Sequence, residues 1–261
     1  MLPPDLPPIS NKALYAWRVF AKWLSFFIFG LSSLILGILV LPLMRLALHP
    51  KARFQKYGRR FISAALKFFI FIMHGLRIVN IEPDNRENYR NLASKIVVAN
   101  HPSLLDVVML LSLIPNADCI VAGYLNHNIL RGVVRQLYIL GSREVEDTFQ
   151  ACTESLKQGN CLIVFPEGTR TPRAGKVILK KGAARIALAT GYSIVPVHIG
   201  GTDKFGLGKK DPWTGFNPRE RYIYRLSMGE EINPEKYRHL PAPAAAKSIT
   251  MEMKNVLFPA Q

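Results

Sequence analysis

The sequence predicts an α/β domain with a mostly parallel sheet flanked by helices, preceded by N-terminal helices that are embedded in a membrane or lie at its interface. Three observations carry this prediction. After residue 80, short β-branched runs alternate with longer segments of helical period. Before residue 80, residues 23–44 form an apolar run without a charge. The net charge of +16 is concentrated beside that run, which indicates a membrane surface or a nucleic acid as partner.

The uncharged run, WLSFFIFGLSSLILGILVLPLM, has 22 residues, enough for a helix to cross a hydrocarbon core of about 30 Å. It is apolar all round, which argues against a buried core helix, and it is too long for a cleaved signal peptide. A second apolar segment, 61–76, is shorter and carries Lys67 in its middle, so we expect an interfacial helix whose lysine reaches the headgroups. The chain therefore begins with one span and a surface helix, or with a hairpin that enters one leaflet.

The charge pattern predicts the side of the membrane. Residues 1–76 hold ten Lys or Arg and one acid. Six of the ten lie between the two apolar segments, where the positive-inside rule places them in the cytoplasm against anionic lipid. We divide the chain into an N-terminal segment 1–22, membrane-associating helices 23–79 and an α/β domain 80–261. This domain is expected at the cytoplasmic face of the membrane, the inner membrane in a bacterium. Nucleic acid is not expected as a partner, because the positive charge lies beside apolar segments.

The elements of the α/β domain follow in order. Strands are expected at 95–99, 119–122, 138–140, 161–165, 193–199 and 221–228, and helices at 103–114, 145–157, 182–190 and 244–257. Pro196 lies inside a strand pattern, which predicts an edge strand or a bulge. Residues 200–220, rich in Gly, Lys and Pro, predict a long surface loop that closes over a site.

The cysteines and histidines indicate neither a disulfide framework nor a metal site. Cys119, Cys152 and Cys161 have no paired spacing and lie in or beside apolar runs, so we expect buried, reduced thiols. The six histidines form no metal-ligand pattern, and no metal is expected.

The first motif whose side chains could take part in catalysis is NHPSLLD, residues 100–106. His101 comes directly after a predicted strand, at the sheet edge where α/β proteins gather their chemistry. Asp106 lies in the first turn of the next helix, where it can orient one imidazole nitrogen and leave the other free to take a proton. A structural role fits as well, in which Asn100 or Ser103 caps the helix and Asp106 complements its dipole.

The second motif, FPEGTR at residues 165–170, also follows a predicted buried strand and is expected at the same edge of the sheet. Gly168 allows a close backbone approach, Thr169 can donate a hydrogen bond, and Arg170 offers a bidentate fork for phosphate. Glu167 suits an anion site only if it orients an arginine or accepts from a substrate hydroxyl. A simple turn accounts for Pro166 and Gly168, but not for the glutamate and the arginine together.

With these motifs the chain resembles the glycerolipid acyltransferases of the lysophosphatidic acid acyltransferase (1-acylglycerol-3-phosphate acyltransferase) family. Asn100, His101, Ser103 and Asp106 match its NHxSxxD motif, and residues 165–170 match its FPEGTR motif without change. IVPVHI and the preceding KKGAARIALATG are similar to a later block of the family. The arginine block is matched weakly by LYILGSR, which ends in Arg143 but lacks the leading glycine and the aromatic residue. The resemblance covers residues 80–232.

The resemblance implies transfer of an acyl group to a hydroxyl. His101, oriented by Asp106, would take the proton of the acceptor as it attacks an acyl thioester, either acyl-CoA or acyl carrier protein. No cofactor is implied. The substrate-binding residues implied by the motifs are Ser103, Arg143, Glu167, Gly168, Thr169 and Arg170. The phosphates of coenzyme A, or the acidic surface of a carrier protein, would attract a set of lysines that also suits an ordinary solvated surface: Lys180, Lys181, Lys204, Lys209 and Lys210.

The first choice of acceptor is the lysophospholipid 1-acylglycerol-3-phosphate, which would give phosphatidic acid. The weak match at Arg143 leaves room for another lipid acceptor, such as a glycolipid or a specialised lipid precursor. A non-catalytic, membrane-tethered lipid-binding protein is the remaining alternative. The intact His101 and Asp106 argue against it, because a binding protein has no need for a base. The chain length of the acyl group and the oligomeric state are not readable from the sequence.

Overall fold

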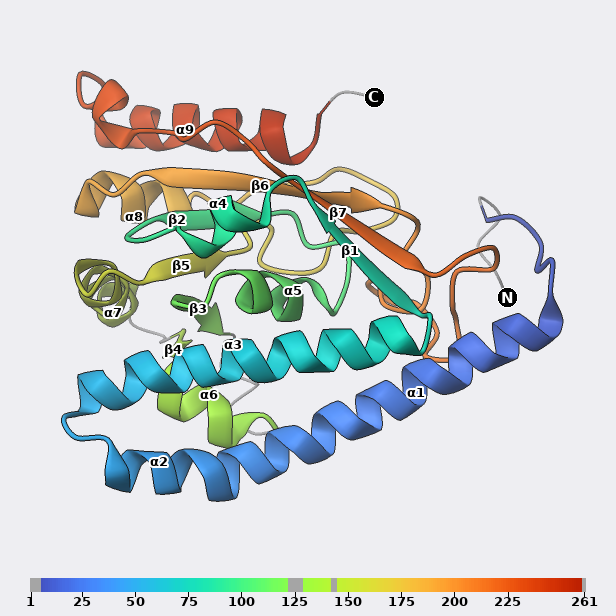
Figure 1. Ribbon diagram of the computed structural model, residues 1–261. Coiled ribbons are helices and arrows are strands. Elements are labelled where there is room, and N and C mark those ends of the chain that lie inside the picture. Colours follow the sequence, from blue (N-terminus) through green and yellow to red (C-terminus); the bar gives the residue numbers. More distant parts are fainter. Residues whose placement is uncertain (1–5, 122–128, 142–144, 260–261) are drawn as a thin grey trace.

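The computed structural model describes residues 6–121, 129–141 and 145–259. Within these ranges seven strands form one sheet in the order β1-β7-β6-β2-β5-β3-β4 (Figure 1). All neighbours pair in parallel except β6 and β7, so the predicted α/β fold with a mostly parallel sheet is confirmed. The strands are β1 Val79–Pro83, β2 Ile96–Ala99, β3 Ala117–Val121, β4 Ile139–Leu140, β5 Cys161–Val164, β6 Ile194–Gly201 and β7 Tyr222–Met228.

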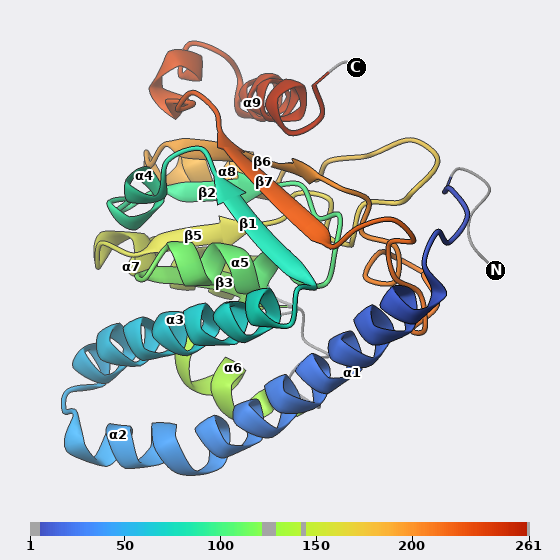
Figure 2. The same ribbon diagram turned by 45° about the vertical axis from the view of Figure 1, so that its right-hand side comes forward.

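Helices cover both faces of this sheet (Figures 1 and 2). On one face lie α7 Val145–Lys157, α8 Gly182–Thr190 and α9 Ala242–Leu257, which share one apolar core with the strands. On the other face lie α5 Asp106–Leu113 and α3 Lys51–Gly75, with α1 Lys12–Ile35 outermost. The shorter elements are η1 Leu36–Val40, α2 Leu41–Ala47, α4 Arg86–Arg90, α6 Arg131–Leu137 and η3 Pro234–Tyr237.

The central strands are apolar at every position because both of their faces are buried. Val97 and Ile163 point into the core under α5 and α3. Their neighbours Ile96, Val98 and Leu162 point into the core under α7, α8 and α9. This alternation explains why the runs KIVVA and CLIVF are continuous and do not alternate with polar residues.

The edge position expected for the strand that contains Pro196 is wrong. That strand, β6, lies inside the sheet between β7 and β2. The expected bulge is present: residues 195 and 196 of β6 lie opposite three residues, 229–231, between the pairs Ile194–Ile232 and Val197–Met228. A proline has no N–H to donate, and the irregular pairing at this point accommodates it inside a sheet.

The N-terminal helices form a hairpin that packs against the α/β domain. α1, η1 and α2 make one continuous helix, Lys12–Ala47, which runs beside α3 (Figure 2). In the described part of the chain this is the one helix long and apolar enough to cross a membrane, and 22% of its most apolar stretch is buried within the protein. Its exposed side chains include four large aromatic residues, Trp17, Phe20, Trp23 and Phe27. Exposed apolar surface of this extent indicates a membrane-associating segment.

Buried polar contacts tie the hairpin to the domain. The guanidinium of Arg59 in α3 lies 2.6 Å from the carboxylate of Asp118 in β3, and both side chains are buried. Arg59 therefore does not face anionic lipid, contrary to the expectation for the basic cluster. In α1, the buried ammonium group of Lys22 donates to the carbonyls of Trp213 and Gly215, at 2.6 Å and 2.5 Å. The hairpin and the sheet thus form one packed unit.

The helix Lys12–Ala47 approaches α6 at a pair of glycines. A Cβ atom added to Gly37 would lie 2.8 Å from the Cα atom of Gly132, and the reverse addition would meet Gly37 at 2.7 Å. Gln136 donates a hydrogen bond to the carbonyl of Gly37 at 3.2 Å across the same contact. Only glycine allows the two backbones to come this close.

Candidate active site

The two motifs lie together at one edge of the sheet. β2 and β5 are parallel neighbours, so NHPSLLD and FPEGTR leave the sheet side by side. The ring of His101 stacks on that of Phe165, with centroids 4.3 Å apart. Asn100 fixes the end of β2 by bonding both backbone groups of Ile199 in β6, at 2.9 Å and 2.6 Å. The expectation that the motifs meet at the carboxyl ends of the strands is confirmed.

His101 and Asp106 form a hydrogen-bonded dyad. The Nδ1 atom of His101 lies 2.8 Å from Oδ2 of Asp106, whose side chain is fully buried. The same carboxylate accepts from the backbone N–H of Ser103 at 2.7 Å and from its hydroxyl at 2.6 Å. An ionised carboxylate is an acceptor only, so this set of donors fits the charged form of Asp106. The imidazole is held through Nδ1, which leaves Nε2 for a reacting proton.

Neither Asn100 nor Ser103 caps the helix, so the capping part of the structural alternative is wrong, whereas Asp106 does lie in the first turn of α5, where its charge complements the helix dipole. Helix α5 begins at Asp106, and its N-cap residue, Leu105, makes no side-chain cap bond. The hydroxyl of Ser103 does accept from the N–H of Leu105, at 3.2 Å, but its shorter bond goes to Asp106. Ser103 therefore acts mainly by holding the carboxylate of Asp106 in place.

A second layer of buried groups, Tyr224 and Lys204, supports Ser103. The hydroxyl of Tyr224 in β7 lies 2.8 Å from that of Ser103, and both side chains are fully buried. The ammonium group of Lys204 lies 4.5 Å from the centre of the Tyr224 ring and donates to the carbonyls of Gly200 and Ile223. Burial raises the pKa of Tyr224 well above its usual value. It lowers the pKa of Lys204 to about 8, although the charge of Asp106 opposes this effect.

The roles of these two residues differ from what the sequence indicated. Lys204 was expected to attract a donor from a surface loop, but its side chain is buried beneath the site. Nothing in the sequence marked Tyr224 as a residue of the site, because tyrosine is common in strands.

Glu167 links the FPEGTR turn to the backbone of His101 by a hydrogen bond. Its Oε1 atom accepts from the N–H of His101 at 2.8 Å and from the hydroxyl of Thr171 at 2.7 Å. Thr171 completes a ring of contacts by donating its N–H to the carbonyl of His101 at 2.7 Å. The Oε2 atom of Glu167 is buried without a hydrogen-bond partner among the described residues, and burial raises the pKa of this carboxyl. The contact of Glu167 with a substrate stays a prediction.

Gly168 and Thr169 form the exposed tip of the turn. Gly168 has a φ of +68°, in the left-handed region that favours glycine. A Cβ atom at this position would lie 2.7 Å from the ammonium nitrogen of Lys180, which reaches over the turn. The tip is therefore open on one side and bordered by a cation on the other.

Arg170 joins the turn to the loop between β6 and β7. One terminal nitrogen, Nη1, donates to the carbonyls of Leu207 and Gly208, each at 2.9 Å. This loop, expected to close over a site, packs between Arg170 and Lys22 of α1, with Phe205 and Phe216 buried inside it. The expected phosphate contact of Arg170 stays a prediction, as does that of Arg143, which lies outside the described residues. In the described ranges no group of three His, Cys, Asp or Glu side chains is placed to hold a metal ion.

Comparison with known proteins gives consistent matches for the sequence and the fold. The family described as Acyltransferase matches residues 80–200. The chain is 33% identical to the chloroplastic 1-acyl-sn-glycerol-3-phosphate acyltransferase of Arabidopsis thaliana, over 53% of this chain and 42% of that protein. It is 30% identical to the chloroplastic enzyme of Brassica napus, over 67% of this chain and 52% of that protein. The chain thus spans about half the length of these plant relatives.

A bacterial relative and a solved structure match over more of their length. A probable 1-acyl-sn-glycerol-3-phosphate acyltransferase of Mycoplasma pneumoniae is 25% identical, over 78% of this chain and 77% of that protein. The crystal structure of the 1-acyl-sn-glycerophosphate acyltransferase from Thermotoga maritima superimposes with a TM-score of 0.67 at 22% identity, covering 94% of this chain and 99% of that one. At this identity the likeness confirms the fold. The motifs, the family match over residues 80–200 and the relatives agree in what the chain is similar to: acyltransferases, and among them 1-acyl-sn-glycerol-3-phosphate acyltransferases.

Proposed function

We propose that the protein is a membrane-bound O-acyltransferase that moves a fatty acyl group from an acyl thioester to the hydroxyl of a lysophospholipid. The acceptor is 1-acylglycerol-3-phosphate and the product phosphatidic acid. The observation that carries the proposal is the hydrogen-bonded dyad of the partly exposed His101 and the buried Asp106, 2.8 Å apart, with the FPEGTR turn hydrogen-bonded to its backbone. A base and an anion-binding turn at one edge are what acyl transfer to a phosphorylated acceptor requires.

The dyad supplies general-base catalysis. Nε2 of His101 takes the proton of the acceptor hydroxyl while its oxygen attacks the thioester carbonyl, and the carbon–sulfur bond then breaks. The departing thiolate receives the proton from the imidazolium. Asp106 holds the tautomer that leaves Nε2 unprotonated at the start, and its charge stabilises the imidazolium that forms. Proton transfer of this kind contributes about 10²- to 10⁴-fold in rate. A thioester is already activated, so we propose that no cofactor takes part.

The FPEGTR turn binds the acceptor phosphate. Nη1 of Arg170 donates to two loop carbonyls, which fixes the guanidinium plane, and we propose that the remaining N–H groups of the guanidinium bind the phosphate. Gly168 and Thr169 are exposed beside it. Arg143 is proposed as a second phosphate contact, and Ser103 acts only through Asp106 because it is fully buried.

The N-terminal hairpin holds this site at the membrane. Large apolar side chains are exposed along the helix Lys12–Ala47, and three phenylalanines are exposed on α3: Phe61, Phe68 and Phe71. We propose that this apolar surface enters the cytoplasmic leaflet, so that lysolipid and product exchange with the site without crossing water. The basic residues within 45–60, between the two apolar segments, face anionic lipid, with Arg59 excepted.

Replacement of the base tests the proposal. Purified protein in detergent is given a panel of lysolipids with acyl-CoA and with acyl carrier protein as donors. We expect transfer to lysophosphatidic acid, and we expect His101→Ala to reduce kcat by at least about 10²-fold while folding and vesicle binding stay intact. His239→Ala, at an exposed histidine outside the site, is the matched control and retains activity.

Two results contradict the proposal in different ways. Full activity of the His101→Ala variant would refute the mechanism. Turnover with another lipid acceptor, but with no lysophosphatidic acid, would refute the acceptor and keep the reaction.

A further inference from the structure

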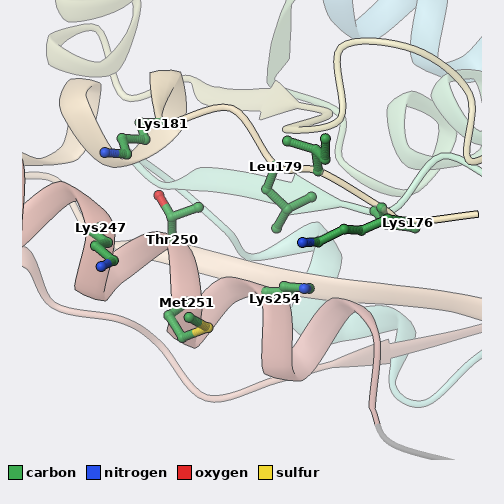
Figure 3. A pocket seen from close by; sticks show the side chains of 9 residues that line it. Lys176, Leu179, Lys181, Lys247, Thr250, Met251 and Lys254 are labelled. Atoms are coloured by element: carbon green, nitrogen blue, oxygen red, sulfur yellow. The ribbon is translucent and has the colours of Figure 1, made fainter.

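A basic groove opens beside the loop that follows the FPEGTR turn. It has a volume of about 320 Å³ and lies between α9 and residues 176–181 (Figure 3). No Asp or Glu is among the described residues that line it. In Figure 3 the ammonium groups of Lys176 and Lys254 point into the same space. Four lysines line the groove in all: Lys176, Lys181, Lys247 and Lys254.

The floor of the groove is apolar. Ile178 and Met251 are 72% and 54% exposed, and Leu179, which also lines the groove, packs against the core beneath α8 and α9. On α9, residues 247, 250, 251 and 254 share one face because they are spaced three, four and seven apart. Cations arranged around an exposed apolar floor suit a ligand that carries several phosphates and a flat, apolar ring.

The loop 171–181, whose residues 176–179 and 181 line the groove, begins and ends at the catalytic motifs. At one end, Thr171 donates its N–H to the carbonyl of His101, and at the other, Lys180 donates to the carbonyl of Pro166, each at 2.7 Å. Lys176 is five residues beyond Thr171, so the groove begins within about 18 Å of His101 along the chain. An extended pantetheine arm has a comparable length.

We propose that this groove binds the 3′-phosphorylated adenosine diphosphate end of coenzyme A, and so holds the acyl donor while its thioester reaches His101. The inference rests on the proposed acyl transfer and names the donor class. Lysine ammonium groups bind phosphates as point charges, and the hollow has the size of a small-molecule site. A carrier protein needs about 20–30 residues on each side of an interface, whereas nine line this groove.

Direct binding tests the groove without turnover. Adenosine 3′,5′-diphosphate is titrated into the full-length protein in detergent by calorimetry. We expect Lys247→Glu/Lys254→Glu to weaken Kd by at least about tenfold, because two charge-assisted contacts become repulsive. The control Lys157→Glu/Lys236→Glu changes the net charge equally at exposed lysines outside the groove, and we expect its Kd to stay within about twofold.

An acyl donor that lacks the nucleotide shows whether the groove variant has lost nucleotide binding or has lost its fold. With palmitoyl-CoA, the groove variant is expected to raise KM by about tenfold at nearly constant kcat, the pattern of a lost uniform binding contact. With palmitoyl-pantetheine, which lacks the nucleotide, variant and wild type are expected to behave alike.

Three results would overturn the inference. They are unchanged nucleotide binding in the groove variant, an equal loss with palmitoyl-pantetheine, and a loss confined to acyl carrier protein as donor. Nucleotide binding is measured without an acceptor, so a wild-type protein that binds the nucleotide but transfers no acyl group refutes the proposed function alone.

Discussion

The hydroxyl pair beneath the dyad, Ser103 and Tyr224, allows a quantitative test of how the base is positioned. The variants are Ser103→Ala, Tyr224→Phe and the double replacement. Ser103→Ala removes a 2.6 Å hydrogen bond to the charged, fully buried Asp106, which costs about 1.5–3 kcal/mol of folding free energy. Tyr224→Phe removes only the 2.8 Å contact between two hydroxyls, which costs about 0.5–1.5 kcal/mol.

The two losses are expected not to add. In Ser103→Ala the Tyr224 hydroxyl stays buried without this partner, and a stranded polar group is itself costly. Adding Tyr224→Phe removes that group, so the double variant is expected to be no less stable than Ser103→Ala alone. The interaction free energy of the cycle is then about 1 kcal/mol. Urea unfolding of the protein in detergent, followed by circular dichroism, measures it.

Kinetics show whether the pair positions the base. Ser103→Ala is expected to lower kcat/KM by about 10- to 100-fold, because Asp106 loses one of its three donors and holds the imidazole less firmly. Ser112→Ala is the matched control: this serine is also buried in α5, but it bonds the carbonyl of Met109 and is expected to keep full activity. Additive stability losses, or an unchanged kcat/KM in Ser103→Ala, would refute the reasoning.

Three further predictions concern contacts around the site. Arg59→Ala is expected to lower the free energy of unfolding, measured by thermal unfolding, by about 3–5 kcal/mol, because it leaves the carboxylate of Asp118 buried without its cation. A decrease below about 1 kcal/mol would contradict this. Gly168→Ala and Gly159→Ala are both expected to lose about 1–2 kcal/mol of stability at their positive φ, but only the first is expected to lower kcat/KM, since Gly159 follows α7 and lies away from the motifs and the groove. Lys204 has a pKa of about 8 in the folded protein and 10.5 in its ordinary state, so the unfolded chain binds more protons between these values and stability rises with pH there. Lys204→Met is expected to remove this rise, up to about 1.4 kcal/mol per pH unit, and an unchanged slope of unfolding free energy against pH would count against the buried ammonium.

Several elements could be predicted because their signals are local. The runs at 95–99 and 161–165 are apolar at every position, which only a strand buried on both faces requires, and each is followed at once by its motif. Helix α7, Val145–Lys157, has the bounds that the periodicity predicts. Elements with weaker local patterns were not predicted. β1 has one fully buried residue, Val79, and α4 has only five residues, so neither presents a clear period.

Contacts between distant parts of the chain lay beyond the reach of local pattern. Ser103 and Tyr224 are 121 residues apart, and Arg59 and Asp118 are 59 apart. Neither pair has a spacing that marks it. Pro196 shows the same limit: its missing N–H predicted an edge or a bulge, and the strand order placed the bulge inside the sheet.

The sequence by itself determined the strand–motif–helix order, the dyad residues and the apolar N-terminal run, because backbone period and side-chain chemistry act over a few neighbouring residues. Only the tertiary structure decided which side chains and helices pack around those residues. It buried Lys204 beneath the dyad, turned Glu167 toward the backbone of His101 and brought α9 against the loop after FPEGTR to form a lysine-lined groove. These outcomes depend on how helices and strands pack on one another, and packing joins residues that no local pattern relates.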